Sequence, residues 1–171
     1  MGLSVPIVSG IMLVALVIVS SMVFQVMVMQ AKSLAQFMDW YASRMAEKLE
    51  VALTLNITSI DVSAGKMNLT LRNVGSKTVF LENNGVLRND VIVAYNSSTV
   101  EWISQMVNYT VLEVRIANAD VAFNPNLHPY LSPGEEALIQ IAVDGVESGS
   151  IVVVVFVSHY GVAAQAEGVA S

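Results

Sequence analysis

The sequence predicts a mainly β protein in which a long N-terminal α-helix precedes an antiparallel β-sandwich. The 171 residues are 54% hydrophobic and only 13% charged, whereas an ordinary soluble domain carries roughly 25% charged residues. No charged residue occurs from Met1 to Ala31. From Val51 onward the apolar residues change from helical spacing to alternation, which is typical of β-strands. These observations together predict a strongly apolar helix followed by a separate β domain.

The first predicted element, residues 1–31, is a transmembrane helix. Between Leu3 and Met29 the only polar side chains are serines and Gln25, and about 20 apolar residues suffice to cross a bilayer as a helix. A cleavable secretory signal would have basic residues before a shorter apolar run, and no Lys or Arg precedes this one. The helix is apolar on all sides, which disfavours a buried helix of a globular core. We therefore expect it to be retained as a membrane anchor.

The second predicted element, residues 32–51, is an amphipathic stalk helix. It contains no Gly or Pro, so nothing forces a break after the transmembrane helix. Apolar residues recur at steps of three and four, which places them on one stripe of the helix. We call this stripe the seam, and it comprises Leu34, Met38, Tyr41, Met45 and Leu49. The seam is a candidate contact for a partner helix, and the alternative is that the β domain or the lipid surface rests on it.

The third predicted unit, residues 52–171, is an antiparallel β-sandwich of the immunoglobulin-like type. Leu53, Leu55 and Ile57 alternate with polar residues, as expected for a strand with one buried face. Seven or eight such strands, separated by Gly, Asn and Asp turns, fit a sandwich of this size. The predicted strands are 53–58, 67–72, 78–81, 86–87 or 91–95, 111–116, 137–143, 151–157 and 162–169.

Four segments of the β domain carry more specific expectations. The apolar run 151–157 is predicted to be a central strand covered on both sides. Residues 100–107, which include Trp102, fit a strand or a short helix equally well. Residues 123–134 hold three of the four prolines and are predicted to form a loop. Residues 145–149 are interpreted as a hairpin turn.

Four Asn-x-Ser/Thr sequons follow the apolar helix, which is more than the composition would produce by chance. Their asparagines, which are candidate glycosylation sites, are Asn56, Asn68, Asn96 and Asn108. A used sequon marks a surface position on an exported domain, so we expect the β domain to lie outside the cell. Three basic residues, Lys32, Arg44 and Lys48, follow the apolar run. The positive-inside rule places the more basic flank in the cytoplasm, so these residues predict the opposite orientation.

The sequence offers few residues that are suited to catalysis, to metal binding or to nucleic-acid binding. The net charge of −6 disfavours nucleic-acid binding, which needs a basic surface to contact the phosphates. The absence of cysteine excludes disulfides, thiolate metal sites and Cys nucleophiles. His128 and His159 are the only histidines, and neither has metal-ligand spacing. Phosphate-binding, dinucleotide-binding and serine-hydrolase motifs do not occur. We therefore expect neither an enzyme nor a cofactor or metal, and we expect His128 to be an ordinary surface residue.

Several short motifs, taken in order, resemble the FlaF-type accessory subunits of the archaeal archaellum and the related FlaG-type subunits. The first is the opening Met1-Gly2-Leu3-Ser4 before the apolar helix, and the second is the triplet Asn56-Ile57-Thr58. An alternating strand then ends in Asn73-Val74-Gly75-Ser76, and Ser132-Pro133-Gly134-Glu135 leads into a later strand. The resemblance spans most of the chain and rests on the combination of motifs.

The resemblance implies a single-pass subunit of the cytoplasmic membrane of an archaeon, with its C-terminal β-sandwich outside the cell. By the same resemblance, the implied partners are the S-layer protein and a sister archaellum subunit, in a homo- or hetero-oligomer. Such a subunit would hold the stationary part of the motor while the filament rotates. This role needs mechanical attachment and no bond-making chemistry.

Two other functions remain open on the sequence. A filament-forming archaellin or type IV pilin-like subunit would also begin with a long apolar helix, although such precursors usually carry a Lys/Arg-Gly cleavage site before it. Here Gly2 is preceded only by Met1, which favours the membrane anchor. The other alternative is a surface adhesin or receptor that binds an external ligand through the proline-rich loop.

Overall fold

The computed structural model describes residues 4–81, 88–96, 101–119 and 121–170. The chain divides into two compact units, Met1–Met45 and Ala46–Ser171. The first unit is helical, and we call the second unit the β domain. One of the two alternatives for the fourth predicted strand, residues 86–87, lies outside the described residues.

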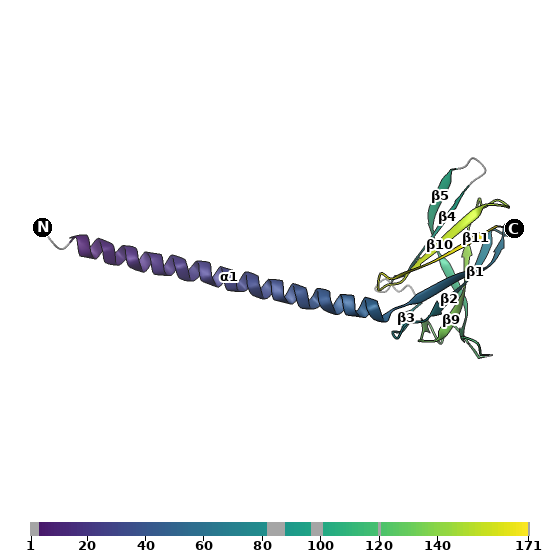
Figure 1. The fold of residues 1–171 in the computed structure, drawn as a ribbon, viewed down its shortest axis with the longest axis horizontal. Coiled ribbons are helices and arrows are strands. Elements are labelled where there is room, and N and C mark those ends of the chain that lie inside the picture. The colour runs from purple at the N-terminus through teal and green to yellow at the C-terminus, as the bar shows by residue number, and fades with distance from the viewer. Residues whose placement is uncertain (1–3, 82–87, 97–100, 120, 171) are drawn as a thin grey trace. The chain divides into compact units, whose positions relative to one another are not determined.

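A single helix, α1 (Ser4–Glu50), contains both the predicted transmembrane and stalk segments. Figure 1 draws it without interruption. Its one proline, Pro6, lies in the first turn, where a missing backbone N–H costs no helical hydrogen bond. From Ile7 to Met45 every side chain is exposed. A long helix with exposed apolar side chains on all sides is not stabilised by water, so it requires lipid or other protein around it.

The β domain contains two main antiparallel sheets and one short strand pair, and Figure 1 labels most of their strands. In the first sheet the order is β1-β2-β9-β6-β7, in the second it is β11-β10-β4-β5, and β3 pairs with β8. The strands are β1 (Leu53–Asp61), β2 (Lys66–Asn73), β3 (Val79–Phe80), β4 (Asp90–Asn96), β5 (Trp102–Val107), β6 (Tyr109–Ile116), β7 (Ala122–Phe123), β8 (Tyr130–Leu131), β9 (Glu135–Ala142), β10 (Ile151–Val157) and β11 (Ala163–Val169).

Alternate residues of both main sheets meet in one hydrophobic core, which confirms the predicted sandwich. On β2 and β9 the buried positions follow every second residue, and β4 and β10 do the same from the facing sheet. Tyr109 and Phe156 meet edge to face in this core, with ring centroids 5.9 Å apart. The largest fully buried side chains are Phe156, Met67, Leu69, Leu71, Leu131, Ile139 and Ile141. Each such side chain contributes about 1.5–3 kcal/mol relative to an exposed one.

The first two predicted strands form a hairpin. Strand β1 pairs antiparallel with β2, with Leu55 opposite Leu71. The turn between them is stabilised by Asp61, whose carboxylate accepts hydrogen bonds from the Ser63 hydroxyl at 2.6 Å and the Ala64 N–H at 3.0 Å. These bonds hold the pKa of Asp61 below its usual value of 3.8. Gly65 completes the turn with φ of 61°, a conformation that suits glycine.

The structure corrects the prediction that residues 151–157 are covered on both sides. Strand β10 is central, between β11 and β4, but only every second side chain, beginning with Val152, is buried. Its other side chains lie on the outer surface of the sandwich. An unbroken apolar run indicated a strand covered on both faces, whereas here the outer face is apolar without being covered by the described part of the chain.

Three further expectations are corrected or settled. Residues 145–149 are not a hairpin turn, because β9 and β10 belong to different sheets. Residues 100–107 contain strand β5 rather than a helix. The proline-rich segment 123–134 is mostly loop, as predicted, but Phe123 ends strand β7, and Tyr130 and Leu131 form strand β8, which pairs with β3.

Candidate interaction surfaces

The last turn of α1, Ala46–Glu50, is held to the turn after β2 by backbone hydrogen bonds. The Glu50 carbonyl accepts from the N–H groups of Ser76 at 2.9 Å and Lys77 at 3.2 Å. Helix C-terminal carbonyls lack intrahelical partners, and here the turn after β2 supplies them. The Lys77 ammonium also lies 3.2 Å from the carboxylate of Glu47. We call this contact between residues 46–52 and 73–77 the junction.

Gly75 allows this close approach. The N–H groups of Val74 and Gly75 both donate to the Ala52 carbonyl, at 2.9 and 3.0 Å. A Cβ atom added at Gly75 would lie 2.5 Å from both the Ala52 nitrogen and the Glu50 oxygen. No side chain fits in that space, so only glycine permits this packing.

Buried Asn73 connects the junction to the later Pro-Gly-Glu motif. Its side-chain amide donates to the carbonyls of Lys77 at 2.8 Å and Leu131 at 2.9 Å, and its side-chain oxygen accepts from the Gly75 N–H at 3.0 Å. The Gly134 N–H donates to the Asn73 carbonyl at 2.9 Å. The two motifs of the family resemblance, nearly 60 residues apart in sequence, therefore meet in one hydrogen-bonded cluster.

The seam lies entirely on the exposed surface of α1. All five of its side chains are exposed, from 42% at Met45 to 87% at Leu49. Leu49 belongs to the same compact unit as the β domain, and its high exposure disfavours the alternative that the β domain rests on this end of the seam. Beside the seam, Phe37 stacks on Tyr41 with ring centroids 6.4 Å apart. An exposed apolar stripe of this kind can pack against a second helix.

The sequon asparagines differ in the solvent exposure and the hydrogen bonding of their side chains. Asn56 is exposed on β1, and Asn108 is exposed between β5 and β6. Asn68 is half-buried, and its amide donates to the Ser59 hydroxyl at 3.0 Å while its oxygen accepts from Gln140 at 3.1 Å. The Asn96 oxygen accepts from the Ile151 N–H at 2.6 Å, and the other two residues of that sequon lie outside the described residues. Asn56 and Asn108 therefore remain the more accessible candidates.

Neither histidine is an ordinary surface residue, which corrects the expectation for His128. Its ring lies between Phe123 and Tyr130, with centroids 4.7 and 3.9 Å away. Its Nε2 is 3.0 Å from the Glu135 carboxylate, which also accepts from the Ser132 N–H at 2.7 Å. Among the described residues there is no group of three or more potential metal ligands. These contacts fix the proline-rich loop on β9.

A second polar network surrounds His159. The Asn89 side-chain amide donates to the Phe80 carbonyl at 2.8 Å and lies 3.0 Å from the Tyr109 hydroxyl, while its oxygen accepts from the His159 N–H at 2.9 Å. Burial lowers the pKa of His159 below 6.5, and the charge of Lys77 lowers it further. Burial raises the pKa of Tyr109 above 10. The sequence carries no signal for this network, because its members are as much as 79 residues apart in the chain.

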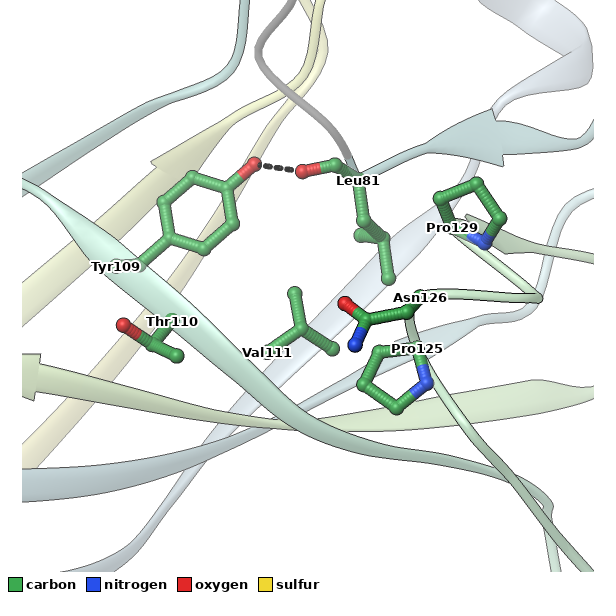
Figure 2. Close-up of a pocket in the computed structure, with 7 residues that line it drawn as sticks. All are labelled: Leu81, Tyr109, Thr110, Val111, Pro125, Asn126 and Pro129. Carbon is green, nitrogen blue, oxygen red and sulfur yellow. Dashed lines mark hydrogen bonds between the residues drawn. The ribbon is translucent and has the colours of Figure 1, made fainter.

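Figure 2 shows a groove between β6 and the proline-rich loop. Its volume is about 360 Å³, and its lining contains no acidic or basic side chain. The Tyr109 hydroxyl donates to the Leu81 carbonyl at 2.5 Å at one end of the groove. The residues that line it are Leu81, Tyr109, Thr110, Val111, Pro125, Asn126 and Pro129. It offers apolar contact and neutral hydrogen-bonding groups, which suit binding rather than acid–base catalysis.

The family model for archaeal-type flagellins matches residues 4–168, which include both α1 and nearly all of the β domain. The chain belongs to the archaeal-type flagellin family. Flagellins are structural proteins, so membership of this family agrees with the expectation that the chain is not an enzyme. No curated protein is detectably similar in sequence to the chain.

Three solved structures resemble this archaeal-type flagellin family member. The archaellum periplasmic stator protein FlaG from Sulfolobus acidocaldarius is 17% identical with a TM-score of 0.44, over 68% of this chain and 100% of that one. A structure of the stator protein complex of FlaF and FlaG from the same organism is 18% identical with a TM-score of 0.43, over 67% and 88%. A β-glucosidase from Kluyveromyces marxianus is 16% identical with a TM-score of 0.34, over 71% and 14%.

Proposed function

We propose that this chain is a structural subunit of the archaeal motility apparatus. In this proposal α1 holds it in the cytoplasmic membrane, and the β domain lies outside the cell. There the β domain binds the S-layer protein, a sister archaellum subunit, or both, as part of the motor's stator. The observation that carries the proposal is the family match, because it extends over both the helix and the β domain.

The composition of α1 supports membrane anchoring. The charge-free part of the helix, residues 4–31, is about 42 Å long at 1.5 Å per residue, and a bilayer's hydrocarbon core is about 30 Å thick. The helix is long and apolar enough to cross a membrane. Lys32 follows directly after this part, so the first charge falls just beyond the apolar run.

The outer surface of the first sheet supports the outside location of the β domain. Thr54, Asn56 and Thr58 project from β1 on the exposed side, and Thr58 shares a hydrogen bond of 2.9 Å with Thr70 on β2. This polar surface carries two of the four sequons, and N-glycans are attached to surface positions of exported domains. The Lys and Arg residues after the apolar run predict the opposite orientation, so the orientation needs a direct test.

Orientation can be tested because the chain has no cysteine. Thr54→Cys places a single thiol on the exposed face of β1. The proposal expects a membrane-impermeant maleimide to label this variant in intact cells as fully as in lysed cells. Labelling only after lysis would place the β domain inside the cell and contradict the proposed location. The unsubstituted chain, which has no thiol, is the control.

The stator proposal also makes a genetic prediction. Deleting the gene in its archaeal host should leave filaments assembled on cells that no longer swim, and the full-length chain should restore swimming. Cross-linking in intact cells followed by partner identification should then recover the S-layer protein or a sister subunit. Normal swimming after deletion, or recovery of neither partner, would contradict the stator role.

A filament-forming subunit is the second candidate, and the description of the family as flagellins favours it. In that case α1 would pack against the helices of other subunits in a filament core instead of lipid. The same deletion separates the two candidates, because loss of a filament subunit removes the filament itself. No feature of the groove in Figure 2 favours an adhesin over these two.

A further inference from the structure

The turn between β10 and β11, residues 158–161, holds a histidine in a fixed position. The His159 backbone N–H donates to the side-chain oxygen of buried Asn89 at 2.9 Å, and the ring Nδ1 lies 3.3 Å from the same oxygen. The turn is closed by the Gly161 N–H, which donates to the Ser158 carbonyl at 2.7 Å. His159 therefore has little freedom to move when its charge changes.

The ring of His159 lies close to the place that the Lys77 ammonium occupies. His159 packs on Tyr160 with ring centroids 4.1 Å apart, and the ammonium lies over the same Tyr160 ring, 5.0 Å from its centroid. Burial lowers the pKa of His159, and the positive charge of Lys77 lowers it further. Because such coupling is reciprocal, a proton on His159 disfavours the ammonium at this place by the same free energy.

Lys77 also connects the turn after β2 to the last turn of α1. Its ammonium lies 3.2 Å from the Glu47 carboxylate, and its backbone N–H donates to the Glu50 carbonyl at 3.2 Å. Residues 46–50 belong to the same compact unit as the β domain. The Lys77 side chain is 26% exposed, so it can move into water more easily than the fixed His159 can move away.

The charged groups on the segments that contact residues 158–161 are Lys48, Lys77, Arg88, Asp90 and Glu47. Lys48 is beside Gly161, because a Cβ atom there would lie 3.3 Å from its ammonium. Both carboxylates are already paired, Asp90 with Arg88 at 2.8 Å and Glu47 with Lys77. The phenols of Tyr109 and Tyr160 are the uncharged titratable neighbours. A proton on His159 therefore adds a positive charge where these two carboxylates are already paired.

We propose that protonation of His159 weakens the hold of the junction on the last turn of α1. The imidazolium repels the Lys77 ammonium, which leaves Tyr160 and Glu47 for the solvent. The hydrogen bonds to the Glu50 carbonyl then lose the ion pair that supports them.

The rest of the junction should respond much less. The Val74 and Gly75 N–H groups donate to the Ala52 carbonyl at 2.9 and 3.0 Å, and Lys77 takes no part in these bonds. The junction then has a pH-sensitive part at Glu50 and a less sensitive part at Ala52. Because the pKa of His159 lies below 6.5, the sensitive part is intact near neutral pH and weakens in acid.

The test is amide hydrogen exchange, measured by NMR on the full-length chain in detergent from about pH 7.5 to about pH 4.5. Rates are expressed as protection factors, because the intrinsic exchange rate itself depends on pH. Protection of the Ser76 and Lys77 amides should fall roughly two- to fivefold, the range expected for loss of a partly exposed ion pair. The fall should coincide with the titration of the His159 ring in the same spectra. The Val74 and Gly75 amides are the internal control and should change less.

Two substitutions isolate the coupled charges. His159→Gln should make the protection of Ser76 and Lys77 independent of pH, because it removes the titrating ring. Lys77→Met should raise the pKa of His159, because it removes the neighbouring charge and keeps a long side chain. Lys66→Met removes an exposed lysine at the start of β2 and is the matched control, which should leave the pKa of His159 unchanged. Thermal unfolding checks that each variant is folded.

Four results would contradict this coupling. The first is protection at Ser76 and Lys77 that does not follow the His159 titration, and the second is the same pH dependence in His159→Gln, which would assign the effect to another group. The third is an unchanged pKa of His159 in Lys77→Met. The fourth is an equal loss of protection at Val74 and Gly75, which would mean a general loosening. None of these outcomes depends on whether the chain serves a stator or a filament.

Discussion

At the scale of single residues, Gly75 makes the junction possible, and its substitution should destabilise the β domain. A Cβ atom there would lie 2.5 Å from two backbone atoms, the Ala52 nitrogen and the Glu50 oxygen. Overpacking of this kind costs about 1–3 kcal/mol. We expect Gly75→Ala to lower the free energy of unfolding by an amount in this range, as measured by denaturant unfolding.

Gly168→Ala is the matched control for this prediction. Its Cβ atom would meet the terminal carbon of the Ile57 side chain at 3.1 Å, and a flexible side chain can move where backbone cannot. The control should therefore lose less stability than Gly75→Ala. Equal losses in the two variants would show that the close backbone approach at Gly75 is not the cause.

His159 should make the stability of the β domain depend on pH. Its folded-state pKa is lowered below 6.5 by burial and by Lys77, so the unfolded chain binds a proton more readily. The resulting stability is present above about pH 6.5 and is lost as the pH falls toward the folded-state pKa. We expect the melting temperature to fall between about pH 7.5 and pH 5.5.

The variant His159→Gln isolates this effect, because it removes the titrating ring and keeps a polar side chain beside Asn89. Its melting temperature should fall less than that of the natural chain over the same pH interval. The difference between the two pH profiles measures the contribution of His159. Parallel profiles would mean that another group causes the pH dependence.

At the scale of elements, the charge-free part of α1 should determine membrane attachment. Placing a charge in the middle of a transmembrane helix costs roughly 2.5–3.5 kcal/mol on insertion scales. Val14→Asp should therefore shift the protein out of the membrane fraction, as measured by membrane flotation. Ser43→Asp, beyond the apolar run on the same helix, should not. Unchanged recovery of Val14→Asp in membranes would rule out a spanning role for this segment.

The seam should contribute to assembly. Met38 and Met45 are exposed and one heptad apart, so replacing both by Glu puts charges in any helix–helix contact there. The double variant should give less chemical cross-linking between α1 helices, with the β domain still folded. Gln36→Glu with Ser43→Glu has the same spacing on another side of the helix and should cross-link normally. Equal cross-linking of both double variants would remove the seam as a contact.

The elements were largely predictable from local pattern. The charge-free run and the absence of helix breakers predicted α1, and period-two alternation predicted the main strands, including β1, β2 and β9. Strand β5 was ambiguous because Trp102, Ile103 and Met106 fit either periodicity. The two-residue strand β8 was missed because it lies within a proline-rich loop and exists only through its pairing with β3.

At the scale of the whole molecule, the sequence could predict a sandwich but not which face would remain open. The run 151–157 is apolar at every position, so its pattern predicted cover on both faces. In the structure its outward side chains lie on the outer face of the second sheet, where Val155 is opposite Ile92 and Val153 is opposite Ala94, because sheet order is set by contacts between residues far apart in sequence. Long-range pairing likewise formed the Asn73 cluster, whose parts were visible only as separate motifs.

The stator proposal places the chain in the membrane with its β domain free to bind neighbours, whereas a filament subunit would leave the membrane with the filament. The most direct test is to shear the filaments from host cells and quantify the chain in the filament and membrane fractions. The account predicts that nearly all of it stays with the membranes. Recovery of most of the chain in the sheared filaments, in proportion to filament mass, would contradict it.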